Sequence, residues 1–208
     1  MTSIEETGDT NYMNVISNRC LGALLLKRLG KPFVNPFIWS ACSYDSIIYT
    51  MEHYDEIDWY NYEISKSTIT KGTCVITVEN QIELHYMHHI FDQYAKNPII
   101  EKDDTWHGEV RYYKIWEIVN DNYLRRVERI RNAEDPVFLI CDQTYPLKNK
   151  HNINDIAYND SRFKRIILTI DKTISRNDNV CKTIYIDRLE DFNILLDKNM
   201  ENIISFLF

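Results

Sequence analysis

Cys20 is the residue of this chain best placed to act as a nucleophile. A short apolar strand is predicted at Val15 and Ile16, and an apolar helix follows Cys20 and ends at Gly30. A thiol at the start of a helix feels the positive end of the helix dipole, which favours the reactive thiolate, and Arg19 acts in the same direction. A thiolate in this position suits acyl transfer through a covalent intermediate. The alternative interpretation is a small apolar residue in the first helical turn.

Thiol catalysis needs an imidazole to take the proton and a carboxylate to orient the imidazole. Two further predicted strands end on such residues, one at His88 and His89 and the other at Asp142. If these strands are parallel and adjacent, a thiol, an imidazole and a carboxylate meet at one edge of the sheet. His85 and His88 point to opposite faces of their strand, so at most one of them aims at Cys20. Asp142 is alternatively a turn former or a helix cap.

The remaining cysteines and histidines carry less information. The chain has five cysteines, an odd number without a Cys-x-x-Cys pair, which argues against a disulfide framework and a structural zinc site, so no metal is expected. Cys74 and Cys181 lie in or beside predicted strands and are expected in the core, while the role of Cys42 stays open. Three histidines lack a supporting pattern and are expected at the surface: His53, His107 and His151.

A basic run stands out on an otherwise acidic chain and contains Arg125, Arg126, Arg129 and Arg131. Arg125 and Arg129 share one face of a predicted helix. Such a cluster is suited to the phosphate groups of a nucleotide or of coenzyme A. The alternative is a solvated helix face that pairs with Glu128.

Strands and helices alternate along the chain. Strands are predicted at 15–16, 74–79, 82–88, 137–141, 165–170 and 183–186, and helices at 21–30, 44–51, 111–133 and 189–208. The segment 31–39 contains two prolines and is expected to be a loop that its aromatic residues anchor to the body of the protein. This order predicts an α/β fold, with one mostly parallel central sheet and helices on both faces, in one domain.

Composition limits the classes of function. The net charge of −7 does not favour nucleic acid or an anionic membrane surface as partner. No apolar run reaches the roughly 18 residues of a membrane span, and the polar start is unlike a signal peptide. We therefore expect a cytoplasmic protein with a disordered tail at 1–11 and a single catalytic domain at 12–208. The apolar ending at 206–208 suggests a domain cut from a longer protein.

Several motifs together resemble two related families, papain-like cysteine peptidases and exopolysaccharide-biosynthesis proteins. The shared pattern is Ser-Asn-x-Cys, an apolar helix that ends in Leu-Gly, and Pro-Phe-x-Trp, which here are residues 17–20, 29–30 and 36–39. The likeness continues in order at 82–89, 123–129 and 138–142, and it does not cover the last third of the chain.

The resemblance implies that Cys20 is the nucleophile, that His88 is its partner and that Asn18 lies beside the thiol. One of the two families tends to have an arginine where this chain has Cys141 and Asp142, which leaves the triad role of Asp142 open. The other residues expected to bind substrate or cofactor are Arg19, Trp39, His85, His89, Arg125, Arg126 and Arg129.

The sugar context of the second family, together with the Ile-, Asn- and Tyr-rich composition, implies a sugar-modifying enzyme of the kind found in giant viruses, acting in the host cytoplasm. The expected reaction moves an acetyl group from acetyl-CoA to the amine of a nucleotide-linked deoxyamino sugar such as viosamine, in glycan biosynthesis. Direct transfer without an acyl-enzyme stays open. A thiol hydrolase or peptidase is the second hypothesis, and a non-enzymatic carbohydrate-binding module is the third. A homo-oligomer is also left open.

Overall fold

The computed structural model describes residues 12–65, 74–86, 109–142, 150–187 and 191–208, so the predicted tail at 1–11 lies outside the described residues. The strands and helices follow one another in this order: β1 (Val15–Ser17), α1 (Leu21–Arg28), β2 (Ser40–Ala41), α2 (Tyr44–His53), β3 (Tyr62–Ser65), β4 (Cys74–Val78), β5 (Ile82–Tyr86), α6 (Glu109–Ile130), β6 (Val137–Cys141), α7 (Ile153–Ala157), β7 (Arg165–Thr169), β8 (Cys181–Tyr185) and α8 (Phe192–Leu207).

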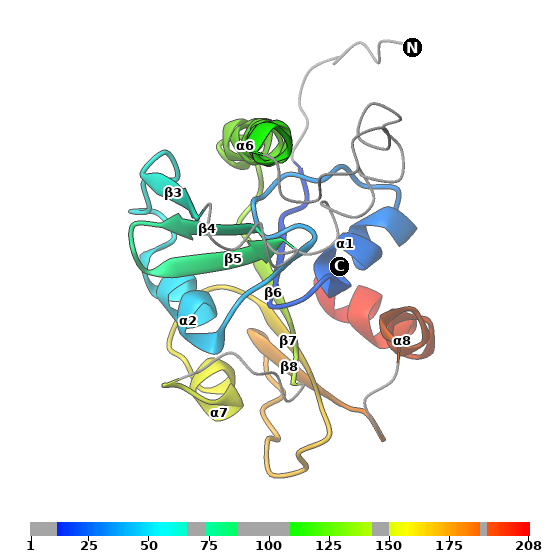
Figure 1. Cartoon of the computed structure of the whole chain (residues 1–208). Helices are drawn as coiled ribbons and strands as arrows, with labels where there is room; N and C mark the ends of the chain where they lie inside the picture. Colours follow the sequence, from blue (N-terminus) through cyan, green and yellow to red (C-terminus); the bar gives the residue numbers. More distant parts are fainter. Residues whose placement is uncertain (1–11, 66–73, 87–108, 143–149, 188–190) are drawn as a thin grey trace.

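Four strands form a parallel sheet in the order β1-β6-β7-β8. These strands are buried almost throughout, as the near-continuous apolar sequence of β6 predicts. Successive side chains point to opposite faces, so Phe138 and Ile140 enter one core while Leu139 and Cys141 enter the other. The helices α1 and α8 cover one face, and α2 and α7 lie over the opposite one (Figure 1). The predicted α/β arrangement with helices on both faces is confirmed for this sheet.

The other four strands form a separate antiparallel sheet in the order β2-β5-β4-β3. β4 and β5 make a hairpin, and its turn holds Glu79 and Asn80 at positive φ angles of 50° and 56°. The hairpin agrees with the two strands predicted around a turn. The condition that this strand runs parallel and adjacent to the strand before Cys20 is not met by β5, which pairs with β2 and β4 and is antiparallel to both in the second sheet. Within the described residues, antiparallel strands are as numerous as parallel ones, against the expectation of one mostly parallel sheet.

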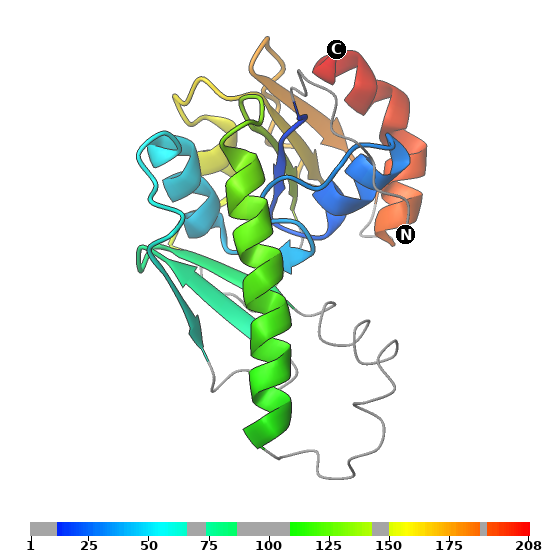
Figure 2. The same cartoon turned by 90° about the horizontal axis from the view of Figure 1, so that it is seen from above.

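The two sheets share one apolar core. Ile76 and Leu84 of the antiparallel sheet belong to the same buried cluster as Phe138 and Ile167 of the parallel sheet. α6 contributes Tyr123 to this cluster and runs past both sheets (Figure 2). At 22 residues α6 is the longest helix among the described residues, but its sequence is interrupted by polar residues. In the part of the chain that the structure describes, no helix combines the length and the apolar character needed to cross a membrane.

Gly22 allows α1 to pack directly on β1. A Cβ added at this position would lie 3.0 Å from the Cβ of Ser17 and 3.3 Å from the carbonyl oxygen of Val15. A Cβ atom and a backbone carbonyl cannot rotate out of the way as the end of a long side chain can, so α1 itself would have to move. Since Cys20 immediately precedes α1, this close packing also fixes the thiol relative to the sheet.

We expect Gly22→Ala to lower the free energy of unfolding by about 1–3 kcal/mol, because overpacking outweighs the better helix propensity of alanine. Chemical denaturation measures the change. Gly22→Ser should cost more than Gly22→Ala, since its side chain is larger. A Gly22→Ala protein as stable as the wild type would contradict this account of the α1–β1 contact.

Candidate active site

The carboxyl ends of β1 and β6 lie side by side and are joined by the side chain of Asn18. Its amide nitrogen donates to the carbonyl of Cys141, and its amide oxygen accepts from the N–H of Cys141, both at 3.0 Å. The backbone carbonyl of Asn18 accepts from the N–H of Cys42 at 3.3 Å. The buried side chain of Asn18, which the resemblance places beside the thiol, clamps the two strands together.

Cys20 is the most accessible thiol of the chain. It is partly exposed, whereas the other four cysteines are buried, and all five are free thiols. The carbonyl of Cys20 accepts from the N–H of Leu24 at 3.0 Å, and Cys20 is the N-cap residue of α1. The first N–H groups of a helix have no partner within the helix, so a negatively charged oxygen formed beside the sulfur would meet donors there.

Burial raises the pKa of the Cys20 thiol from 9.0 to about 11. The charge of Arg19 and a backbone hydrogen bond lower the pKa, in the direction expected from the sequence, but desolvation outweighs both. The net shift is therefore opposite in direction to the one expected from the helix dipole and Arg19. At neutral pH the sulfur is protonated, and a base must remove the proton before the sulfur attacks.

Alkylation of Cys20 by iodoacetamide is accordingly expected to accelerate with pH up to about 11, without levelling off near 9.0, because only the thiolate reacts. Timed alkylation followed by peptide mass mapping measures the rate for each cysteine. Cys42 is the internal control: burial also raises the pKa of its thiol, and its side chain is only 3% exposed, so it should react more slowly. A Cys20 rate that reaches its plateau below pH 9.0 would contradict this expectation.

Asp142 directly follows β6 at the same edge of the sheet. Its Oδ1 accepts from the hydroxyl of Tyr44 at 2.9 Å, and its Oδ2 accepts from the hydroxyl of Thr169 at 2.7 Å. Burial, followed by the charge and hydrogen bond of Asp142, raises the pKa of Tyr44, so Tyr44 stays neutral and donates. The carboxylate is thus held by two neutral hydroxyl groups from α2 and β7.

Tyr44 and Thr169 were not recognised as site residues in the sequence. The helix predicted from residue 44 is capped by Ser43, whose hydroxyl accepts from the N–H of Ser46 at 3.1 Å. A cap at Ser43 places Tyr44 in the first turn of α2, but its contact with Asp142 spans 98 positions of the chain and has no local signal.

A second carboxylate lies one residue further along α2 and contacts the start of the α7 region. Asp45 accepts from the N–H groups of Lys150 and His151, and its Oδ1 lies 2.8 Å from Nδ1 of His151. These backbone and side-chain hydrogen bonds lower the pKa of Asp45 although burial opposes them. His151, which was expected at the surface, is half-exposed and forms a carboxylate–imidazole pair that the sequence did not predict.

Within the described residues, no histidine that was predicted as a partner of Cys20 lies next to the thiol. His88 and His89 lie outside them. His85 lies on β5, opposite Ala41 of β2, and its Nε2 is 3.4 Å from a carboxylate oxygen of Glu83. Within the described part of the chain, no contact joins His85 to Cys20.

Arg19 and Trp39 occupy different environments. Arg19 is 7% exposed, and its charge lowers the pKa of Cys20, Cys42 and Cys141 against the larger effect of burial. Its positive charge therefore lies close to the candidate site. Trp39 has a φ of 61° and packs edge-to-face on Phe33, with ring centroids 6.0 Å apart. This contact agrees with the predicted anchoring of the 31–39 loop by its aromatic residues.

The basic run on α6 makes mainly structural contacts. The buried guanidinium of Arg126 donates to the carbonyl of Ile38 at 2.9 Å, and that of Arg129 donates to the carbonyl of Phe33 at 3.2 Å. Both tie α6 to the 31–39 loop. Arg125 is exposed and bonds within its own helix, to Asp121 and Asn122. Phosphate binding by this cluster stays a prediction.

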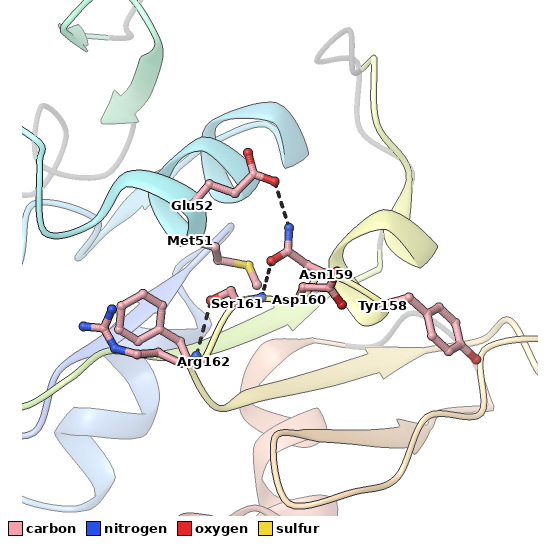
Figure 3. Close-up of a pocket in the computed structure, with 8 residues that line it drawn as sticks. Met51, Glu52, Tyr158, Asn159, Asp160, Ser161 and Arg162 are labelled. Carbon is pink, nitrogen blue, oxygen red and sulfur yellow. Dashed lines mark hydrogen bonds between the residues drawn. The ribbon is translucent and has the colours of Figure 1, made fainter.

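A polar hollow of about 520 Å³ lies away from Cys20, between the end of α2 and the segment before β7 (Figure 3). It is lined by Met51, Glu52, Tyr158, Asn159, Asp160, Ser161, Arg162 and Phe163. Its polar side chains bond to one another: Asn159 donates to Glu52 at 3.0 Å and accepts from the N–H of Ser161 at 2.8 Å. The hollow contains no nucleophile paired with a base, and none of its lining residues was predicted.

Among the described residues, no group of histidine, cysteine, aspartate and glutamate side chains has the arrangement of a metal site. A comparison with curated proteins gives no match. Residues 4–106, which include Cys20 and His88 but not Asp142, match the model of a domain of unknown function, DUF1919.

Proposed function

We propose that the protein is an acyltransferase in which the Cys20 thiol takes an acetyl group from acetyl-CoA and passes it to the amine of a sugar. The proposal is carried by the position of Cys20, the one cysteine that is not buried, at the N-cap that opens the first turn of α1. That turn lies at the carboxyl edge of a parallel sheet, where ligands of α/β proteins bind. The family resemblance around residues 17–39 points to the same thiol.

In the first half-reaction a base removes the Cys20 proton and the sulfur attacks the carbonyl carbon of acetyl-CoA. A carbon–sulfur bond to the enzyme forms, the bond to coenzyme A breaks, and the released thiolate takes up the proton. The raised pKa of Cys20, caused by burial, makes the base a requirement. The family resemblance assigns this role to His88, and the first N–H groups of α1 would stabilise the oxyanion.

The resemblance also supports a nucleotide-linked deoxyamino sugar such as viosamine as acceptor, in glycan biosynthesis. Five free cysteines are consistent with a reducing compartment, and we propose the cytoplasm. The apolar core shared by the two sheets supports residues 12–208 as one catalytic unit. Hydrolysis would use the same thiol, with water in place of the amine.

The test follows coenzyme A release from acetyl-CoA by chromatography, with and without a nucleotide-linked 4-amino-4,6-dideoxy sugar. We expect release to depend on the amine, and intact-mass analysis without the amine should detect one acetyl group on Cys20. A sugar that carries a hydroxyl in place of the amine is the control. Equal release with and without the amine would instead favour a hydrolase. No release and no acetylated protein with a panel of amino sugars would overturn the proposal.

A further inference from the structure

Asp142 is a half-buried carboxylate that forms no ion pair in the described part of the chain, although the charge of the nearby Arg19 acts on the same neighbours, Tyr44 and Cys141. Its hydrogen bonds come from the hydroxyl groups of Tyr44 and Thr169, and its own N–H donates to the carbonyl of Leu168 at 2.8 Å. Each carboxylate oxygen accepts one of these hydroxyl bonds and keeps a further lone pair. The site can therefore accept hydrogen bonds from a ligand without losing those that hold it in place.

Two other carboxylates that join separate elements, Asp55 and Asp197, have cationic partners. Asp55 contacts Arg162 at 2.8 Å, and Asp197 contacts Arg28 at 2.9 Å. Partial burial of a negative charge is costly unless the charge is compensated, and neutral hydroxyl donors compensate it less well than a cation does. A cationic ligand on Asp142 would therefore add a charged hydrogen bond to the two neutral ones.

Asp142 and Cys20 leave the sheet on neighbouring strands. Ser17 of β1 pairs with Leu139 of β6, and the Asn18 clamp joins the two chains just beyond this pair. Cys20 follows Ser17 by three positions, and Asp142 follows Leu139 by three positions. Cys20 and Asp142 therefore both lie just beyond the carboxyl ends of these two neighbouring strands.

We propose that Asp142, held by Tyr44 and Thr169, binds the acceptor as an ammonium group and places its nitrogen against the acyl group on Cys20. This inference rests on the proposed acyl transfer and assigns the amine subsite of that reaction. Asp142 then serves as a direct contact for the substrate. It replaces the predicted role of a carboxylate that orients a histidine.

The proton balance of the second half-reaction fits this role. The bound ammonium first gives one proton to Asp142, which passes it to solvent. The neutral nitrogen attacks the thioester carbonyl, a carbon–nitrogen bond forms and the carbon–sulfur bond breaks. The sulfur leaves as a thiolate and takes the second proton from the nitrogen. The products are the amide, the Cys20 thiol and one released proton.

The test compares Asp142→Asn with the wild type in each half-reaction. Acetylation of Cys20 by acetyl-CoA should stay within about threefold, whereas KM for the amino sugar should rise about 10- to 100-fold, because a charged hydrogen bond is lost. Asp187→Asn is the matched control, since it is an exposed aspartate at the end of β8 on the same sheet edge. Thr169→Val keeps the charge of Asp142 and should change KM much less.

The binding preference between two sugars gives a second measurement, and its wild-type value does not depend on the stability of a variant. The amino sugar should bind at least about tenfold more tightly than its hydroxyl analogue, and Asp142→Asn should abolish this preference. Equal binding of the two sugars, or an unchanged KM in Asp142→Asn, would overturn the amine subsite while leaving acyl transfer intact. A wild type that never becomes acetylated and never releases coenzyme A would instead overturn the proposed function.

Discussion

Cys20→Ala is expected to lower kcat/KM for acetyl transfer on the order of 10³-fold or more, as removal of a catalytic nucleophile does in other enzymes. No second thiol can replace it, because the four remaining cysteines are buried. Cys20→Ser should be nearly as inactive, since a hydroxyl is far harder to deprotonate than a thiol. Initial rates of coenzyme A release measure the loss, and intact-mass analysis should find no acetylated protein.

Cys42→Ala is the matched control for this result. The Cys42 thiol lies next to β1, but it is buried and makes only a long contact of 3.8 Å to the carbonyl of Ser17. We expect the activity of the Cys42→Ala variant to stay within about threefold of the wild type when the two proteins are compared at equal concentrations of folded protein. Full activity in Cys20→Ala would rule out the acyl-enzyme and leave direct transfer from acetyl-CoA to the amine.

Local sequence patterns predicted much of the secondary structure, because they report local physics. The apolar run at 137–141 coincides with β6, and the helix predicted at 111–133 overlaps α6. The division into two sheets was not predictable in this way. A short turn determines that β4 and β5 pair with each other, but not which sheet the hairpin joins. The two-residue strand β2 is too short to leave a periodic pattern.

The position of the candidate site could be predicted from the sequence, but the pKa of Cys20 and the hydrogen-bond partners of Asp142 could not. Strand ends placed Cys20 and Asp142 at one edge of the sheet. The sequence also identified the two effects that lower the pKa of Cys20, but it contains no measure of burial, which is the largest effect and has the opposite sign. The hydroxyl groups around Asp142 come from residues 98 and 27 positions away, so only the folded chain brings them together.

Asn18→Ala is expected to lower the free energy of unfolding by about 2–4 kcal/mol, because it leaves the buried N–H and C=O of Cys141 without their partner. Chemical denaturation measures this loss. Asn202→Ala, an exposed position on α8, is the control and should stay within about 0.5 kcal/mol of the wild type. An Asn18→Ala protein as stable as that control would show that the clamp contributes nothing to stability.

The Asn18→Ala substitution also tests whether the clamp holds Cys20 and Asp142 in the relative position that acetyl transfer needs. Asn18 is the side chain that joins the exits of β1 and β6, and these two exits carry Cys20 and Asp142. If the amine subsite is correct, loosening the clamp should impair acetyl transfer more than the first half-reaction, because only transfer needs both residues in register. Comparing the two half-reactions at equal folded fraction separates this effect from simple unfolding. An equal loss in both would mean that Asn18 positions the thiol alone.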